Sequence, residues 1–162
     1  MTSGPTYTPI ATTTGTGSSG TINFTSIPST YTDLILIWNY QNSSNPYSIF
    51  LTFNNDTGTN YSGTYVDTNG PRSYRATNQT GIECGYSTSS GFVFWQEKIQ
   101  IMNYSNTVTY KTALGTENQD ALTVSRWASL WRSTAAINTV TITASTNFVA
   151  GSTFTLYGIA AA

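Results

Sequence analysis

The strongest constraint on the fold is an alternation of polar and apolar side chains with a period of two residues. It is clearest near the C-terminus, where Thr153–Gly158 reads TFTLYG. This period places successive side chains on opposite faces of a β-strand, so one face here is apolar and the other tolerates water. We therefore expect a C-terminal strand that pairs within a sheet built from upstream segments.

Other segments carry related patterns. Asp33–Tyr40 (DLILIWNY) is apolar on both faces, which is typical of a central strand or a subunit contact. Gly91–Tyr104 (GFVFWQEKIQIMNY) places Glu97 on an otherwise apolar face, while its opposite face turns polar halfway along. Turn residues separate about nine to eleven such strands. The predicted fold class is all-β: an antiparallel β-sandwich, jelly-roll-like.

Several local predictions follow from turn chemistry. Ser48–Phe53 runs into Asn54–Asn60 (NNDTGTN), whose Asn, Asp and Gly residues favour a tight turn and predict a hairpin. Gly115–Asp120 (GTENQD) is polar and predicts a loop. Trp127–Trp131 (WASLW) fits a short helix and a strand about equally well. Tyr61–Gly91 predicts a long excursion with short strands, which makes it the candidate surface for variable recognition.

The length predicts one domain, since 162 residues suffice to bury an independent core. We divide the chain into residues 1–20, an N-terminal arm with a Gly/Ser hinge (GTGSSG), and residues 21–162, a single β-sandwich domain. The arm contains a candidate strand at Thr6–Thr13. We expect it to reach a neighbouring subunit.

Composition excludes several classes of protein. The chain has no histidine and one cysteine, which removes the commonest zinc ligand, the usual general base and any internal disulfide. Only 8% of residues are charged and the net charge is −1, which disfavours nucleic acid and anionic membranes as partners. The N-terminus has neither a basic nor a long apolar segment, and the longest strongly apolar run in the chain is LILIW, so we expect no signal peptide, no membrane span and synthesis in the cytoplasm. We also expect no cofactor.

The most site-like polar cluster contains Glu117 and Asp120, with Glu97 as a third carboxylate. A glycoside hydrolase needs two carboxylates facing one bond, about 5 Å apart for retention or about 6.5–9.5 Å for inversion. Nothing in the sequence sets such a distance, and a solvated loop whose polar side chains cap turns explains these residues more simply. We expect no enzyme, and keep hydrolysis by Glu117 and Asp120 as an alternative.

Two further candidates are interpreted as structural. Asn54, Asp56 and Asn60 are spaced loosely like a calcium loop but lack its terminal bidentate carboxylate, so a turn is favoured. Cys84 has no histidine to activate it, and the adjacent Glu83 would raise its pKa, which predicts an inert, half-buried thiol.

Aromatic and basic residues have two interpretations each. Tryptophan rings could stack on sugars, but a core or subunit interface uses the same residues and is favoured here; they are Trp38, Trp95, Trp127 and Trp131. Arg72 with Arg75, and Arg126 with Arg132, are interpreted as contacts to a partner protein rather than a phosphate track.

Several segments together resemble a family of small bacteriophage virion structural proteins. The matching segments, in order, are YTPIATTT, INFTSIPSTYTDLIL, FNNDTGTNYS, IQIMNYSNTVTYK, LWRSTAAINTVTITA and NFVAGSTFTLYGI. They span Tyr7 to Ile159, and the most specific part is STAAI followed by the C-terminal LYGI. The resemblance implies a jelly-roll-like sandwich on a phage particle, with no catalytic residues to carry across.

Two roles on such a particle are considered. The first is a capsid decoration or cement protein that binds the outer shell, stabilises it, and acts as a dimer or trimer through many weak contacts with the major capsid protein or other virion proteins. The alternative is a tail or tail-fibre module that binds a carbohydrate or receptor through aromatics such as Tyr65 or Tyr86. The sequence assigns no catalytic, cofactor-binding or metal residues, and leaves the interface residues unknown.

Overall fold

The computed structural model describes residues 6–44, 47–67, 72–87, 94–119 and 123–160. These residues form twelve β-strands and no helix. The strands are β1 (Tyr7–Thr14), β2 (Thr21–Phe24), β3 (Asp33–Tyr40), β4 (Tyr47–Phe53), β5 (Tyr61–Asp67), β6 (Arg72–Gln79), β7 (Ile82–Ser87), β8 (Trp95–Met102), β9 (Lys111–Gln119), β10 (Thr123–Trp131), β11 (Val140–Ala144) and β12 (Thr153–Ile159). No helix in this part of the chain is long and apolar enough to cross a membrane.

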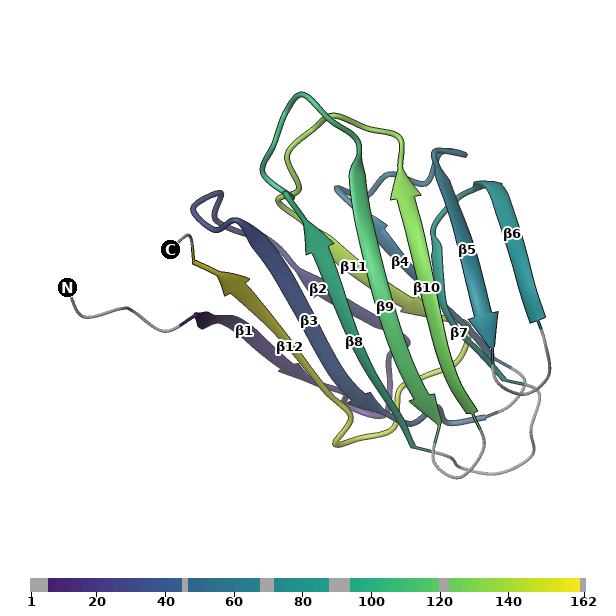
Figure 1. Cartoon of the computed structure of the whole chain (residues 1–162). Helices are drawn as coiled ribbons and strands as arrows, with labels where there is room; N and C mark the ends of the chain where they lie inside the picture. The colour runs from purple at the N-terminus through teal and green to yellow at the C-terminus, as the bar shows by residue number, and fades with distance from the viewer. Residues whose placement is uncertain (1–5, 45–46, 68–71, 88–93, 120–122, 161–162) are drawn as a thin grey trace.

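The strands form two antiparallel sheets packed face to face (Figure 1). The large sheet has eight strands in the order β1-β12-β3-β8-β9-β10-β5-β6, and the small sheet has four in the order β2-β11-β4-β7. Most connections, such as β2 to β3, β3 to β4 and β10 to β11, cross from one sheet to the other. Only β5–β6 and the meander β8–β9–β10 join consecutive strands in one sheet. The predicted all-β, jelly-roll-like sandwich is confirmed.

The C-terminal strand lies inside the large sheet, as its pattern predicts. β12 pairs with β3 on one side, where Leu156 is opposite Leu36, and with β1 on the other, where Thr155 is opposite Thr12. The segment predicted as an arm thus forms the edge of its own sheet, and the Gly/Ser segment after it is tied down by a 2.7 Å hydrogen bond from Gly15 N to Ser152 O. Its predicted contact with a neighbouring subunit stays a prediction.

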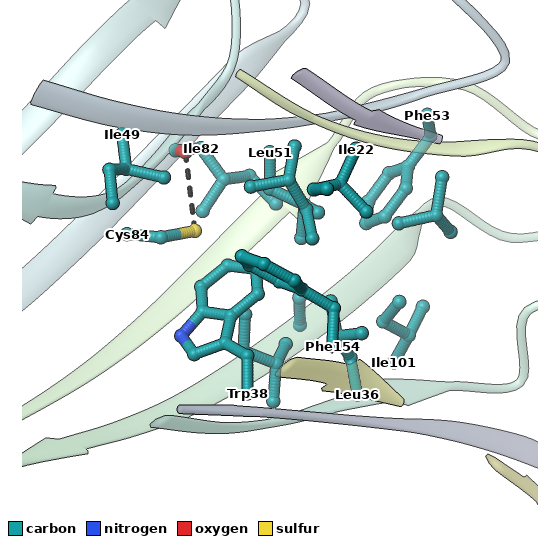
Figure 2. Close-up of a cluster of buried hydrophobic side chains, with 14 of the residues drawn as sticks. Ile22, Leu36, Trp38, Ile49, Leu51, Phe53, Ile82, Cys84, Ile101 and Phe154 are labelled. Carbon is teal, nitrogen blue, oxygen red and sulfur yellow. Dashed lines mark hydrogen bonds between the residues drawn. The ribbon is translucent and has the colours of Figure 1, made fainter. Parts of the chain in front are cut away.

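The core is formed by the inward faces of both sheets. Trp38 and Phe154 from the large sheet meet edge to face at 5.8 Å, and Ile49 and Cys84 from the small sheet lie on the opposite side of the interior (Figure 2). Edge-to-face contacts of this kind add to the stabilisation from buried apolar area. The only cysteine of the chain is free, so these packing contacts hold the two sheets together without a disulfide.

Two local predictions are wrong. β4 and β5 do not form a hairpin, because both sides of β4 are already occupied by β11 and β7, and the chain crosses to the large sheet instead. Gly115–Gln119 is not a loop: it is the second half of β9, and it pairs residue by residue with β8 and β10. Of its described polar residues, Glu117 faces the interior, while Thr116 and Asn118 lie on the opposite side of the strand.

Two open questions are answered by the strand register. Trp127–Trp131 belongs to β10, where both tryptophans and Ser129 face the interior. The excursion at Tyr61–Gly91 contains β5, β6 and β7, and residues 68–71 and 88–91 lie outside the described part of the chain.

Candidate functional site

Two carboxyl side chains lie directly opposite each other in the interior. Glu97 on β8 is paired with Glu117 on β9, and they are 3% and 8% exposed. Directly opposed residues of antiparallel strands have Cβ atoms about 4.5–5.5 Å apart, and like charges at that separation destabilise the sheet. The pair is therefore the least expected chemical feature of the core.

The Glu97 carboxyl is held by a tryptophan from a strand two positions away. Trp127 on β10 is opposite Gly115 on β9, and its indole lies over that glycine: a Cβ at Gly115 would be 1.9 Å from the ring. From there Trp127 Nε1 donates a 2.9 Å hydrogen bond to Glu97 Oε1. Glu97 Oε2 and Trp38 Nε1 are also buried, and neither forms a hydrogen bond within the described residues. Gly115 thus provides the space that lets Trp127 reach Glu97.

Burial raises the pKa of Glu97 well above its ordinary value, and the carboxyl of Glu117 raises it further. The hydrogen bond from Trp127 opposes this shift but does not reverse it. The folded protein therefore favours a protonated Glu97.

The structure places Glu117, one of the two predicted hydrolase residues, in a buried strand rather than in a loop. Glu117 lies in β9 facing the core and is brought to Glu97, while Asp120 lies outside the described residues. A glycosidase carboxylate pair must flank the scissile bond, which requires access for a sugar ring. The described pair is enclosed between the sheets and offers none. Among the described residues, no group of three or more Cys, Asp or Glu side chains is arranged to hold a metal ion.

Cys84 is more buried than predicted. It is 1% exposed, and its thiol donates a 3.4 Å hydrogen bond to the carbonyl of Ile82 (Figure 2). Burial raises the pKa of the thiol well above its ordinary value, and the carboxyls of Glu97, Glu117 and Glu83 add to the shift. A protonated, enclosed thiol is a poor nucleophile, so its role is packing.

The segment predicted as a turn forms a hydrogen-bonded corner rather than a cation site. Asp56 Oδ2 accepts hydrogen bonds from Trp131 Nε1 at 2.7 Å and from Asn60 Nδ2 at 2.9 Å, and Oδ1 accepts one from Gly58 N at 2.8 Å. Burial alone would raise the pKa of Asp56, but these hydrogen bonds outweigh it and lower the pKa. Asn54, in the left-handed region with φ of 52°, bonds to the segment before β11 instead.

The aromatic residues divide clearly between the core and the surface. All four tryptophans are buried, as the core interpretation predicts: Trp38, Trp95, Trp127 and Trp131. Tyr65 is buried too, so its ring is not available to stack on a sugar, whereas Tyr86 is 55% exposed.

The solvent-facing side of strands β3, β8, β9, β10, β5 and β6 of the large sheet, here called the outer face, combines apolar and basic residues. Figure 1 shows the small sheet behind the large one, with no described layer in front of the outer face. One row across neighbouring strands consists of Ile37, Lys98, Thr116, Arg126 and Val66. Four of these are exposed and Thr116 is half-buried. An uncovered face with large apolar residues is typical of an interaction surface.

A second row lies one step along the strands. It runs from Leu114 through Ala128 and Thr64 to Arg75 on the edge strand β6. Small side chains on β10 and β5 leave a shallow trough of about 300 Å³ here, with Arg75 and Leu130 among its lining residues.

The charges described on the outer face are basic apart from one acid at its margin. That acid, Asp33, accepts 2.8 Å hydrogen bonds from Gln100 Nε2 and Asn103 N. Arg75 and Arg126, from two different predicted pairs, share this face. Arg132 instead donates to Thr59 O at 2.7 Å, and the side chain of Arg72 lies outside the described part.

Comparisons with protein family models, with curated proteins and with solved structures find no match for this chain.

The sequence singles out Glu97 and Glu117 as candidate carboxylates but does not show that they form a buried pair, and it does not reveal the outer face as a site. The pattern of β8 does place Glu97 on an apolar face, but the polar residues around Glu117 suggest a loop. The outer face depends on which strands are neighbours, and the order β8-β9-β10-β5-β6 is what brings Lys98, Arg126 and Arg75 together. The sequence signal for the outer face was the set of alternate positions that each predicted strand turns to solvent.

Proposed function

We propose that this chain is a non-enzymatic structural protein of a bacteriophage virion, which decorates the outer shell and stabilises it. Its partners are the major capsid protein or other virion proteins. In this role the sandwich is a rigid platform that presents a contact surface, and many copies on a symmetric lattice make individually weak contacts effective.

The observation that carries the proposal is the outer face of the large sheet. Three of its large apolar side chains, Leu114, Val124 and Val66, are 40–55% exposed. Exposed apolar residues gathered on one face of a sheet are typical of a surface that contacts another protein. A broad, uncovered sheet face suits an extended protein surface better than it suits a small ligand, which prefers an enclosed cleft. The resemblance of the ordered segments from Tyr7 to Ile159 to small phage virion proteins supports the same role.

Reconstitution tests this function. Shells of the phage that encodes the chain, prepared without it, are mixed with the purified protein and then separated from the unbound fraction. We expect saturable binding, together with a rise in the temperature at which heated particles release their DNA. The control is denatured protein whose circular-dichroism spectrum no longer shows β-sheet. Shells that bind no protein and lose DNA at an unchanged temperature would contradict the proposal.

A further inference from the structure

We propose that the outer face docks onto an acidic, partly apolar protein surface, with Lys98, Arg126 and Arg75 facing carboxylates of the partner. This inference rests on the proposed function, because the partner in that case is a protein of the virion shell. It adds which face makes the contact and what chemistry the partner presents.

The first argument is the distribution of charge. Lys98 and Arg126 lie in one row with Thr116 between them, so their strands are about 10 Å apart at two spacings of about 4.8 Å. Arg75 lies in the adjoining row. All three side chains are exposed, and the one acid described on this face, Asp33, is already engaged by Gln100 and Asn103. The basic groups therefore remain available to a partner.

The second argument is the apolar surface between these charges. Leu114 is 40% exposed and Val66 is 55% exposed, and they lie beside the basic residues in the same two rows. The trough next to Arg75 has hydroxyl and apolar lining residues, including Thr64 and Leu130, and is large enough to accept a side chain of a partner. A protein surface supplies both carboxylates and apolar side chains, which matches this mixture.

Two other occupants fit less well. A nucleic acid needs a continuous basic track, but only three cations are described here, separated by apolar residues, in a chain of net charge −1. A second copy docked through the same face by a two-fold axis would bring Lys98 and Arg126 of both copies into one contact, where like charges repel.

The test compares two variants that lower the net charge equally. Lys98→Gln with Arg126→Gln removes two charges from the outer face, and Thr25→Glu with Thr143→Glu adds two acids at exposed positions of the small-sheet side. Binding to shells prepared without the protein is measured at about 0.01 M and about 0.15 M salt, where the Debye length falls from about 30 Å to about 8 Å. Circular dichroism checks that both variants keep the fold.

We expect the outer-face variant to bind about 2- to 30-fold more weakly at low salt, since each of two exposed ion pairs contributes a factor of about 1.4 to 5. It should also lose most of the salt dependence, while the small-sheet variant binds like the wild type. Equal binding by the wild type and the outer-face variant would overturn this inference and leave the proposed function intact. A wild type that does not bind shells at either salt concentration would overturn both. Wild-type binding to random duplex DNA that the outer-face variant loses would also overturn this docking assignment.

Discussion

Replacing Glu97 with Gln should remove a pH dependence from the stability of this protein. Glu97 is 3% exposed, is directly opposite Glu117, and accepts a hydrogen bond from Trp127. Gln keeps the shape of a protonated Glu and an oxygen that can accept that bond, but it carries no proton to lose. The substitution therefore isolates the cost of ionising this position.

The sign and size follow from linkage. The pKa of Glu97 is raised in the folded state from an ordinary value of 4.5, so its favourable contribution is fully present below that value. As pH rises toward the raised folded pKa, the unfolded chain releases a proton that the folded chain retains, and stability falls. One proton gives a slope of about 1.4 kcal/mol per pH unit. For a chain of this size that is about 3–6 °C in Tm per pH unit.

Thermal unfolding from pH 5 to pH 8 measures this slope. Cys84 and Tyr40, which pack near the pair, stay neutral there because burial raises the pKa of both. We expect Glu97→Gln to be flatter than the wild type and more stable at pH 8. Glu117→Gln removes the opposing carboxyl and should move the end of the wild-type slope to lower pH. Glu83→Gln, on the small sheet, removes a carboxyl outside the pair and is the matched control. Parallel curves for the wild type and Glu97→Gln would refute the reasoning.

Three further perturbations test the packing of the same core. Gly115→Ala should lower Tm by about 2–12 °C, because a Cβ at this position would lie 1.9 Å from the Trp127 ring and overpacking costs about 1–3 kcal/mol. An unchanged Tm would mean that the indole does not lie over this glycine. Trp131→Phe should lower the free energy of unfolding by about 1–2 kcal/mol at pH 7, because it removes the 2.7 Å hydrogen bond to Asp56. The pKa of Asp56 is lowered in the folded protein, so this contribution is lost in acid, and the deficit should shrink as pH falls below the ordinary Asp pKa of 3.8. A deficit independent of pH would contradict the role of the carboxylate. Cys84 should resist thiol reagents in native buffer and react fully in denaturant, and rapid native labelling would contradict its burial.

The fold class was predictable because period-two patterning reports burial one strand at a time. Thr153–Ile159 and Trp95–Met102 both show it, and both are strands with the expected inward faces. Where the inward face carries polar or very small residues, the pattern fails. β9 turns Lys111, Gly115 and Glu117 inward, so its sequence resembles a loop although all three are buried.

Contacts between strands were beyond the reach of local patterns. The turn at Asn54–Asn60 is correctly predicted, but a tight turn does not specify whether the next strand pairs with the previous one or crosses to the other sheet. The same limit applies to the Glu97–Glu117 pair and to the outer face, because each depends on which strands are neighbours. Register and strand order are properties of the whole fold, set by how all the inward faces fill one core.

The proposed role as a repeated component of a virion shell can be tested by the copy number of this protein in purified particles of the phage to which the proposal assigns it. Quantitative mass spectrometry against the major shell protein provides that number. We expect a copy number close to that of the shell protein, as for a subunit that decorates the whole lattice. A handful of copies per particle would contradict it and favour the tail, where the exposed Tyr86 would become the first residue to test for glycan binding.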